Sequence, residues 1–434
     1  MNTKIQVFRL VVLGLLASSA CVGAHAQAFR EVVQNALANY PALQAARAKT
    51  EAARADIDRA RAAHMPQIAY GYTHSKYSNT ALPASTKQNM NTPSVKLNLW
   101  AGGRIEADAE RSEALLASSE QLEAVSRDDV AQQAAEAYIN WARSLDMYAL
   151  ASNNVVSLNT TLDEIRKIVA VDTGRRIDYD QAKVRLDNAT LTQLQRQTEL
   201  AQARQRLSRF WPGALPVQPV GLSEALADTR VLGQMPEGMA QVVDQINDDL
   251  PNIAQQKAQV VAAAAAVEMA KGQYWPSVDL SSTRQMNQVA VPGFFGSTYT
   301  YKEDTLTQVQ LSMPLYNGGA TSAAVTAAVS QLSAAQSTLD EVRLVVREKA
   351  VFAYEDWLNA KARAAQGVAQ SRMGEQVVEG YRQQFRLARR QLLDLLNIQA
   401  ESFGYQSAAM TAFYDEQVAR VRLLAVMGDL AKRF

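Results

Sequence analysis

The chain has 434 residues, of which 48% are apolar and 20% are charged, and its formal net charge is +1. This length accommodates one large domain or two ordinary ones. The balanced charge argues against a dedicated nucleic-acid binder, which usually carries a basic excess or a basic stripe. We therefore expect no nucleic-acid partner.

The first 26 residues have the features of a secretory signal peptide. Lys4 and Arg9 form a basic start, residues 10–16 (LVVLGLL) form a short apolar segment, and residues 24–26 (AHA) fit the A-x-A cleavage pattern. No apolar run of the length of a transmembrane helix follows residue 26. The sequence therefore predicts an exported chain whose mature part has no transmembrane helix.

The only cysteine of the chain, Cys21, lies inside this predicted signal peptide. It is either a lipid-accepting cysteine or a residue that is discarded on cleavage. Ser18 stands where lipid-accepting sites usually carry Leu or Val, which favours the second interpretation. The mature chain would then contain neither disulfides nor thiolate metal sites.

Matching residues recur at a nearly constant spacing, which indicates a tandem duplication. Pro41 and Pro66 match Pro251 and Pro276 at an offset of 210 residues. Further along the chain the offset becomes 216, and it relates Gly102 to Gly318, Gly103 to Gly319, Tyr138 to Tyr354, Trp141 to Trp357 and Asp178 to Asp394. We predict a first repeat over 27–210, a turn-rich linker over 211–235 and a second repeat over 236–434.

Each repeat is expected to end in a long helical hairpin. No proline lies between Pro93 and Pro212 or after Pro314, and these stretches are rich in strong helix formers. From residue 134 to residue 169, apolar and small residues recur every 3.5 residues on average, which is the coiled-coil period. The pattern predicts a helix over about 103–169, a turn at Gly174 and a returning helix over about 177–210.

Two strands are predicted before each hairpin, at about 66–77 and 92–101 in the first repeat and 276–288 and 304–316 in the second. Apolar and polar residues alternate in all four, as in a strand with one apolar face. The alternating segments are roughly ten residues long, the length of a tilted strand that crosses a bilayer. Aromatic residues gather at the strand ends, where Trp and Tyr favour a membrane interface. Polar loops are expected over about 78–91 and 289–303.

These strands have two interpretations. They could form an antiparallel sheet that is buried against the helices, or they could span a membrane. Four strands cannot close a transmembrane barrel, since the smallest have about eight, and an open sheet edge cannot face lipid. If the strands span a membrane, several chains must share one barrel, and the sequence does not give their number.

Motifs of catalysis are absent from the sequence. The three histidines are His25 in the predicted signal peptide, His64 at an expected helix end and His74 on an expected strand. Neither H-E-x-x-H, G-x-S-x-G, G-x-G-x-x-G nor a phosphate-binding loop occurs. We therefore predict no enzyme, no catalytic residues and no metal site.

The duplicated unit, the motifs LNLWAGGR (97–104) and MPLYNGGA (313–320), and the segment RRQLLDLLNIQAE (389–401) together resemble the TolC-like outer-membrane efflux proteins. The resemblance implies a mainly α chain with membrane β-structure, in which each half supplies long coiled-coil helices and two strands. Three chains would share a 12-stranded β-barrel that is continuous with an α-helical barrel. Such a homotrimer would lie in the outer membrane of a Gram-negative bacterium, in contact with outer-membrane lipid, and would extend far into the periplasm.

The resemblance also implies a passive exit duct that uses no cofactor. The duct would dock on an inner-membrane ABC or other transporter through a periplasmic adaptor protein. The run LLDLLN (392–397) resembles family members that act in type I protein secretion, so this function is favoured. The alternatives are a channel for small-molecule or multidrug efflux and a soluble periplasmic coiled-coil adaptor.

Residues of a periplasmic gate follow from the resemblance. Asp178 and Arg390 match an acid–base pair that links neighbouring helices, and Asp394 matches the acidic residue that rings the constriction. Asn397 stands where a second acid is common and Phe385 where an aromatic hydroxyl is common, so we expect a weaker or differently built lock. Asp178 and Asp394 could also be acids that stabilise the N-termini of their helices.

The strand–helix junctions are the second candidate site. The chain is expected to leave the bilayer at these positions, with aromatic residues at the periplasmic interface and glycines that allow the backbone to turn. The residues are Trp100, Gly102 and Gly103 in the first repeat and Tyr316, Gly318 and Gly319 in the second. The glycines could be needed for positive φ angles or only for close packing between chains.

Overall fold

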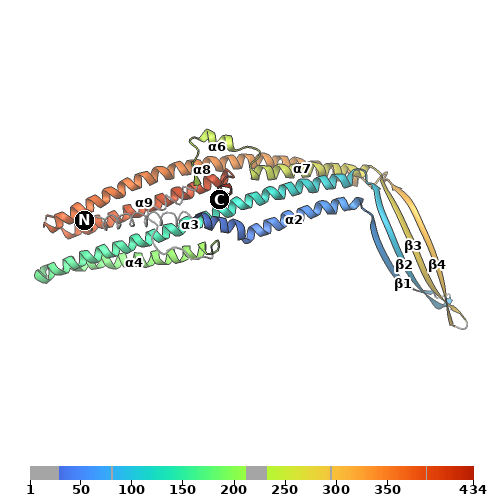
Figure 1. Ribbon diagram of the computed structural model, residues 1–434, viewed down its shortest axis with the longest axis horizontal. Helices are drawn as coiled ribbons and strands as arrows, with labels where there is room; N and C mark the ends of the chain where they lie inside the picture. Colours follow the sequence, from blue (N-terminus) through green and yellow to red (C-terminus); the bar gives the residue numbers. More distant parts are fainter. Residues whose placement is uncertain (1–28, 80–81, 212–231, 294–295, 388) are drawn as a thin grey trace, which may run out of the picture. The chain divides into compact units, whose positions relative to one another are not determined.

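The computed structural model describes residues 29–79, 82–211, 232–293, 296–387 and 389–434 (Figure 1). The predicted signal peptide and most of the predicted linker lie outside these residues. Helices dominate the described part, and four strands form a single sheet. The predicted fold class, long helices with two strands in each half of the chain, is confirmed.

The two halves of the chain share the order helix, 3-10 helix, two strands and two further helices. The first half contains α2 (Pro41–Arg61), η1 (Ala62–His64), β1 (Gln67–Asn79), β2 (Leu82–Trp100), α3 (Arg104–Val171), η2 (Thr173–Arg175) and α4 (Arg176–Leu207). The second half contains α6 (Met239–Gln245), α7 (Pro251–Lys271), η4 (Gly272–Tyr274), β3 (Ser277–Gly293), β4 (Gly296–Ser312), α8 (Ala320–Arg386), α9 (Leu392–Val426) and η5 (Ala431–Arg433).

Contacts divide the chain into two compact units, each assembled from both halves. One unit comprises Met1–Ala46, Glu123–Pro251 and Leu344–Phe434, and the other comprises Arg47–Leu122 and Asn252–Arg343. The compact units therefore do not coincide with the predicted repeats. The physical reason is that each repeat presents an apolar helix face that it cannot bury alone, so equivalent segments of the two repeats pack together.

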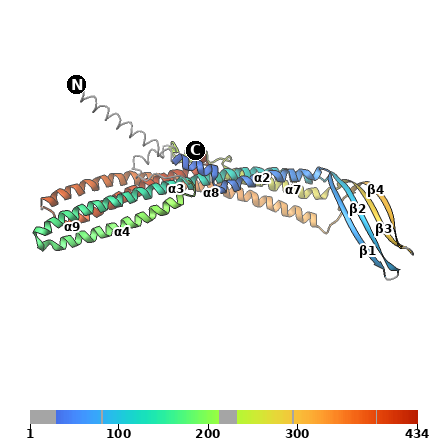
Figure 2. The same ribbon diagram turned by 60° about the horizontal axis from the view of Figure 1, so that its bottom comes forward.

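The helical unit, which contains the hairpins α3–α4 and α8–α9, is organised around the predicted 3.5-residue seam. Figures 1 and 2 both show these four helices running side by side. On α3, the seam residues Ala134, Trp141, Leu145, Leu158 and Ile165 are all buried. The seam ends where α3 ends, at Val171, within two residues of the predicted position. Within the described residues, no helix combines the length and the apolar content that a membrane span requires.

The sheet is antiparallel with the strand order β1-β2-β3-β4, as Figure 2 also shows. Its strands have 13 to 19 residues and run through most of the segments that we expected to be polar loops. The pairs His74–Asn89 and Gln288–Tyr301 lie in this extension. The predicted strands were too short because the alternation of apolar and polar residues stops before the strands end. Backbone hydrogen bonding between strands needs no apolar side chains.

One face of the sheet carries an apolar band, and cross-strand partners place its residues on the same side. Ile68 pairs with Val95, Leu97 with Leu280, Leu280 with Val309, and Val278 with Leu311. The opposite face is mostly polar, with the rows Gln67–Lys96–Ser281–Gln308 and Asn98–Asp279–Gln310. The named apolar residues lie in the helix-proximal part of each strand.

Candidate functional site: hairpin turns and strand–helix junctions

The α3–α4 turn is closed by acidic residues that bind within the turn. The carboxylate of Asp172 accepts a hydrogen bond from the Gly174 backbone N–H at 3.1 Å. Asp178, in the first turn of α4, binds the Arg175 guanidinium at 2.8 Å. Because Asp178 lies in a first helical turn, its charge also stabilises the helix N-terminus. The turn lies where Gly174 predicted it, but the capping role of Asp172 was not foreseen.

Arg390 organises the α8–α9 turn. Its guanidinium lies 3.8 Å from the carboxylate of Asp394, donates to the Gln384 side chain at 3.2 Å, and stacks over the Tyr381 ring at 4.7 Å. Asp394 belongs to the first turn of α9, as Asp178 does in α4. Tyr381 therefore supplies the aromatic hydroxyl residue near Arg390, one helical turn before the position that Phe385 occupies.

The two residues that depart from the family pattern have separate structural roles. Phe385 is buried in an apolar cluster with Leu158, Ile165 and Leu392. Asn397 is exposed and accepts a hydrogen bond at 2.9 Å from Arg185 of α4. Phe385 thus packs in an apolar cluster that both hairpins share, whereas Asn397 links the two hairpins by a hydrogen bond without a second acidic charge.

The described contacts pair Asp178 with Arg175 and Arg390 with Asp394, each within its own hairpin. No described contact joins Asp178 to Arg390 inside this one chain. Their pairing therefore stays a prediction about neighbouring helices in an assembly. The ring arrangement of Asp394 is likewise a prediction about an assembly, because one chain supplies one carboxylate.

Both strand–helix junctions require positive φ at their paired glycines. The φ angles are 67° at Gly102, 79° at Gly103, 70° at Gly318 and 86° at Gly319. Residues with a Cβ rarely adopt this region, since the left-handed conformation costs roughly 1–2 kcal/mol per residue. The glycines therefore let β2 and β4 continue into α3 and α8 after a sharp change of direction.

Close packing adds a second requirement at Gly102 alone among these four glycines. A Cβ at Gly102 would lie 2.7 Å from both the Gly272 carbonyl oxygen and the Trp275 Cβ. At Gly103 and Gly318, a Cβ would meet nothing within 4 Å. Positive φ is therefore required at all four glycines, and close packing within the chain is required at Gly102. Close packing between chains stays a prediction.

The aromatic residues of the two junctions differ in position. Trp100 is the last residue of β2 and is 40% exposed, whereas Tyr316 lies beyond the end of β4 and is 88% exposed. Strand β4 ends at Ser312, before the predicted position of about residue 316, because Pro314 has no N–H to donate to a strand hydrogen bond. Both side chains remain accessible, as an interfacial role requires.

The polar face of the sheet leads into a cavity of about 580 Å³ at the first junction. Asp279 accepts a hydrogen bond from Asn98 at 2.9 Å and lies 3.3 Å from the Lys96 ammonium. Gln67, Arg104 and Asp108 also line this cavity. A polar, charged lining of this kind is suited to water and dissolved ions rather than to lipid.

Within the described residues, no group of three or more His, Cys, Asp or Glu side chains could hold a metal ion. His64 contacts Glu106 at 3.1 Å and His74 contacts Asn89 at 2.6 Å. These two histidines therefore make pairwise polar contacts on the strands and neighbouring helices.

The geometry defines a channel-type membrane chain, in which an amphipathic sheet continues through glycine junctions into long helical hairpins. The sequence matches the family profile described as outer membrane efflux protein over residues 32–212 and 242–429. The chain belongs to the outer membrane efflux protein family. It is therefore an outer-membrane component of a Gram-negative bacterium and a channel protein rather than an enzyme.

Individual relatives and structures agree with this family. The chain is 24% identical to the outer membrane efflux protein BepC of Brucella suis over 97% of its own length and 90% of that protein. It is 26% identical to the nickel and cobalt resistance protein CnrC of Cupriavidus metallidurans over 78% of its length and 76% of that protein. A solved structure of CusC superposes with a TM-score of 0.78 at 17% identity, covering 92% of this chain and 91% of CusC.

Substitutions at the first junction separate the two requirements. Gly102→Ala combines a positive φ with a backbone clash and should lower the thermal unfolding midpoint markedly. Gly103→Ala meets open space and should cost only the left-handed penalty, roughly 1–2 kcal/mol. Thermal unfolding of each purified full-length variant, followed by circular dichroism, checks this order. Equal losses for the two variants would contradict the role of the Gly272 contact.

Proposed function

We propose that this chain forms, with two further copies, the exit duct of an efflux assembly that spans the cell envelope. A periplasmic adaptor and an inner-membrane transporter would supply the cargo, and the duct itself would be passive. The observation that carries the proposal is the amphipathic sheet, whose two edge strands each have one partner strand within the described residues. The family resemblance supports the number three, because three four-stranded sheets make a 12-stranded barrel.

The sheet edges support a barrel shared between copies. Within the described residues, β1 pairs only with β2 and β4 pairs only with β3. The apolar band on one face fits lipid, and lipid offers no partners for the free backbone N–H and C=O groups of an edge strand. Pairing β1 of one copy with β4 of the next removes both edges and closes the sheet.

The helical unit shows matching unpartnered surfaces. In Figures 1 and 2, α4 and α8 lie on opposite sides of the four-helix layer, with α3 and α9 between them. Both outer helices carry exposed apolar side chains at heptad spacing. They are Ile177, Val184 and Leu191 on α4 and Met373 and Val377 on α8, and Leu387 follows directly after the end of α8.

The two helices run in opposite chain directions from the hairpin turns, since α4 begins and α8 ends there. Two different surfaces that complement each other produce head-to-tail contacts, which close into a ring when the rotation allows it. We infer that α4 of one copy packs against α8 of the next. The helical barrel would then close through the same neighbour that closes the sheet.

The gate residues would lie at one end of such a ring, where the hairpins turn. Asp178 and Arg390 lie at the turns of the two hairpins, and in the ring they would face residues of neighbouring helices. Three Asp394 carboxylates would surround the axis and favour cations over anions. Asn397 in place of a second acid would reduce this preference, and Trp100 and Tyr316 would lie at the periplasmic interface.

The cargo of the duct is proposed from the relatives. BepC is named as an efflux protein and CnrC as a nickel and cobalt resistance protein, which favours efflux of small toxic solutes or ions. This is the alternative that the sequence placed second to type I protein secretion. The LLDLLN run and the poor placement of Cys21 for a lipid anchor favour protein secretion, and a direct comparison of the two cargo classes decides between them.

Deletion of the gene in its host tests the proposed function. We expect greater sensitivity to small toxic solutes, such as nickel, cobalt or organic solvents, and an unchanged set of secreted proteins. The measurements are growth inhibition and the protein content of the medium. Loss of one secreted protein without any change in sensitivity would favour type I secretion. No change in either would contradict both cargo classes.

Conductance tests the gate. Asp178→Ala and Arg390→Ala should each increase the conductance of the purified protein in planar bilayers, because each removes a charge that orders a hairpin turn. The increase would come from channels that are open for more of the time. We expect the ratio of open to closed time to rise about two- to fivefold, as for the loss of an exposed ion pair. Asp187→Ala, on the exposed part of α4, is the control. Unchanged conductance in both gate variants would remove Asp178 and Arg390 from the gate.

A further inference from the structure

A cavity of about 650 Å³ lies in the helical unit between α3, α4 and α9, away from the hairpin turns. Four arginines line it, and they are Arg143 of α3, Arg196 and Arg206 of α4, and Arg209 just after the end of α4. A guanidinium group matches the planar oxygens of carboxylate and phosphate groups and can donate two parallel hydrogen bonds to them. Four arginines around one cavity therefore favour an anionic ligand.

The two carboxylates that line this cavity already have arginine partners. Glu136 of α3 accepts hydrogen bonds from Arg422 of α9 at 2.9 and 3.4 Å. Glu199 of α4 accepts a hydrogen bond from Arg196 at 2.7 Å. A carboxylate that is held by a guanidinium repels a second anion less than a free carboxylate does. These acidic side chains therefore do not offset the charge of the remaining arginines.

The remaining arginines of the cavity carry the unbalanced positive charge. Arg143 binds the Asp415 carboxylate of α9 at 3.1 Å. Arg206 and Arg209 are exposed at the end of α4, and neither forms an ion pair with another residue that the structure describes. The Arg209 guanidinium instead lies 5.4 Å from the centre of the Phe210 ring. Both guanidinium groups therefore keep donors for an anion that enters the cavity.

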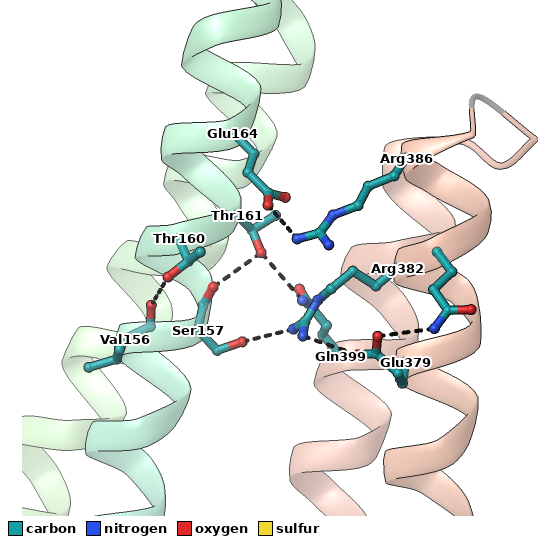
Figure 3. A network of polar contacts seen from close by, with 10 residues as sticks. Val156, Ser157, Thr160, Thr161, Glu164, Glu379, Arg382, Arg386 and Gln399 are labelled. Carbon is teal, nitrogen blue, oxygen red and sulfur yellow. Dashed lines mark hydrogen bonds and ion pairs between the residues drawn. The ribbon is translucent and has the colours of Figure 1, made fainter.

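Other arginines of the helical unit have partners within the chain (Figure 3). Arg386 of α8 donates to the Glu164 carboxylate of α3 at 2.8 Å, and Arg382 donates to the Ser157 hydroxyl at 3.4 Å. These contacts lie nearer the hairpin turns, and they join the two hairpins directly. The two arginines at the end of α4 make no such contact, so pairing within the chain does not account for them.

The cavity opens on one face of α3, whereas the opposite face of this helix is covered. Glu136, Asn140 and Arg143 line the cavity at spacings of four and three residues, which places them on one side of α3. On the other side, the Tyr138 ring packs 5.2 Å from the ring of Phe29, in the helix that precedes α2. The cavity therefore lies on the face that this N-terminal helix leaves uncovered.

The basic lining continues toward α8. A neighbouring cavity of about 710 Å³ shares Asn140 and Arg143 with the four-arginine cavity. Its acidic lining residues are Asp356 and Asp415, and its other basic lining residues are Lys349, Arg363 and Arg422. Basic side chains thus outnumber acidic ones in both cavities, and they form a band from α4 to α8.

We propose that the four-arginine cavity binds the carboxylate or phosphate groups of anionic solutes on the inner wall of the duct. The proposal rests on the proposed function for the place of the cavity, because one face of the helical layer points to the axis of a closed ring. The N-terminal helix fits the outer face, where it does not obstruct the passage, so the cavity faces inward. The small solutes that the duct carries then include anionic ones.

Calorimetric titration of the purified full-length protein in detergent tests the cavity independently of transport. The probe is inorganic pyrophosphate, and we expect the parent protein to bind it saturably. Arg206→Gln and Arg209→Gln each remove one guanidinium group and keep a polar side chain. Each should weaken binding about fivefold, the upper limit for an exposed charge pair. Absence of binding by the parent, or binding that neither variant weakens, would overturn the proposal.

The matched control is Arg204→Gln. Arg204 belongs to the same last turn of α4 as Arg206, is also exposed and undergoes the same loss of charge, but it does not line the cavity. Unchanged binding by this variant supports a defined site, whereas a fivefold loss would assign the effect to general positive charge and overturn the site.

A hexaglutamate peptide is the second probe in the titration. We expect it to bind more weakly than pyrophosphate, because the cavity faces the axis of the duct and not a partner protein. Binding of the peptide without any binding of pyrophosphate would assign the cavity to an acidic segment of a protein. That result would overturn the assignment to anionic solutes.

Single-channel recordings in planar bilayers separate failure of the site from failure of the duct. Pyrophosphate should reduce the KCl current through the parent protein, and Arg206→Gln should relieve this block whereas Arg204→Gln should not. An unblocked current through a protein that binds pyrophosphate would overturn the position of the cavity on the inner wall. Absence of any conductance would contradict the duct alone, since the titration still decides whether the cavity binds anions.

Discussion

Backbone hydrogen bonds at the two edges of the sheet are the constraint on which the rest of the structure depends. The apolar band on one face suits lipid, but β1 and β4 each have a partner strand on one side only within the described residues. In lipid these edges must be paired, and a second copy of the same sheet offers complementary edges. The helical hairpins have the same need for a neighbouring copy, because α4 and α8 carry exposed apolar side chains on opposite sides of their layer.

The strand–helix junctions connect the sheet to the helical hairpins. A barrel strand tilts, whereas a barrel helix packs along its neighbours, so the chain must change direction between them. Paired glycines with positive φ make this change over a few residues in each half. The duplicated sequence therefore supplies two strand-to-helix crossings per chain, and the packing of Gly102 against Gly272 places the first crossing against η4, where α7 leads into β3.

Much of this architecture could be predicted from the sequence, because local patterns determine it. The 3.5-residue seam and Gly174 gave the bounds of α3 and the position of its turn. The strands were predicted too short, since apolar alternation marks the lipid-facing part only and not the hydrogen-bonded extension. The stacking of Tyr381 on Arg390 could not be predicted, because the structure of the turn decides which side chain reaches the guanidinium. The Glu164–Arg386 pair joins residues more than 200 positions apart, and no local pattern indicates it.

The central claim is that α4 of one copy packs against α8 of the next in a ring of three. The sequence contains a single cysteine, at position 21 in the predicted signal peptide, so an introduced pair can be followed without a competing thiol in the mature chain. The most direct measurement is oxidative cross-linking of the variant that carries both Val184→Cys and Val377→Cys in the outer membrane. The account predicts covalent species of two and three chains and none larger, with no cross-linking in either single variant. Cross-links confined to single chains, or a ladder that continues beyond three, would contradict it.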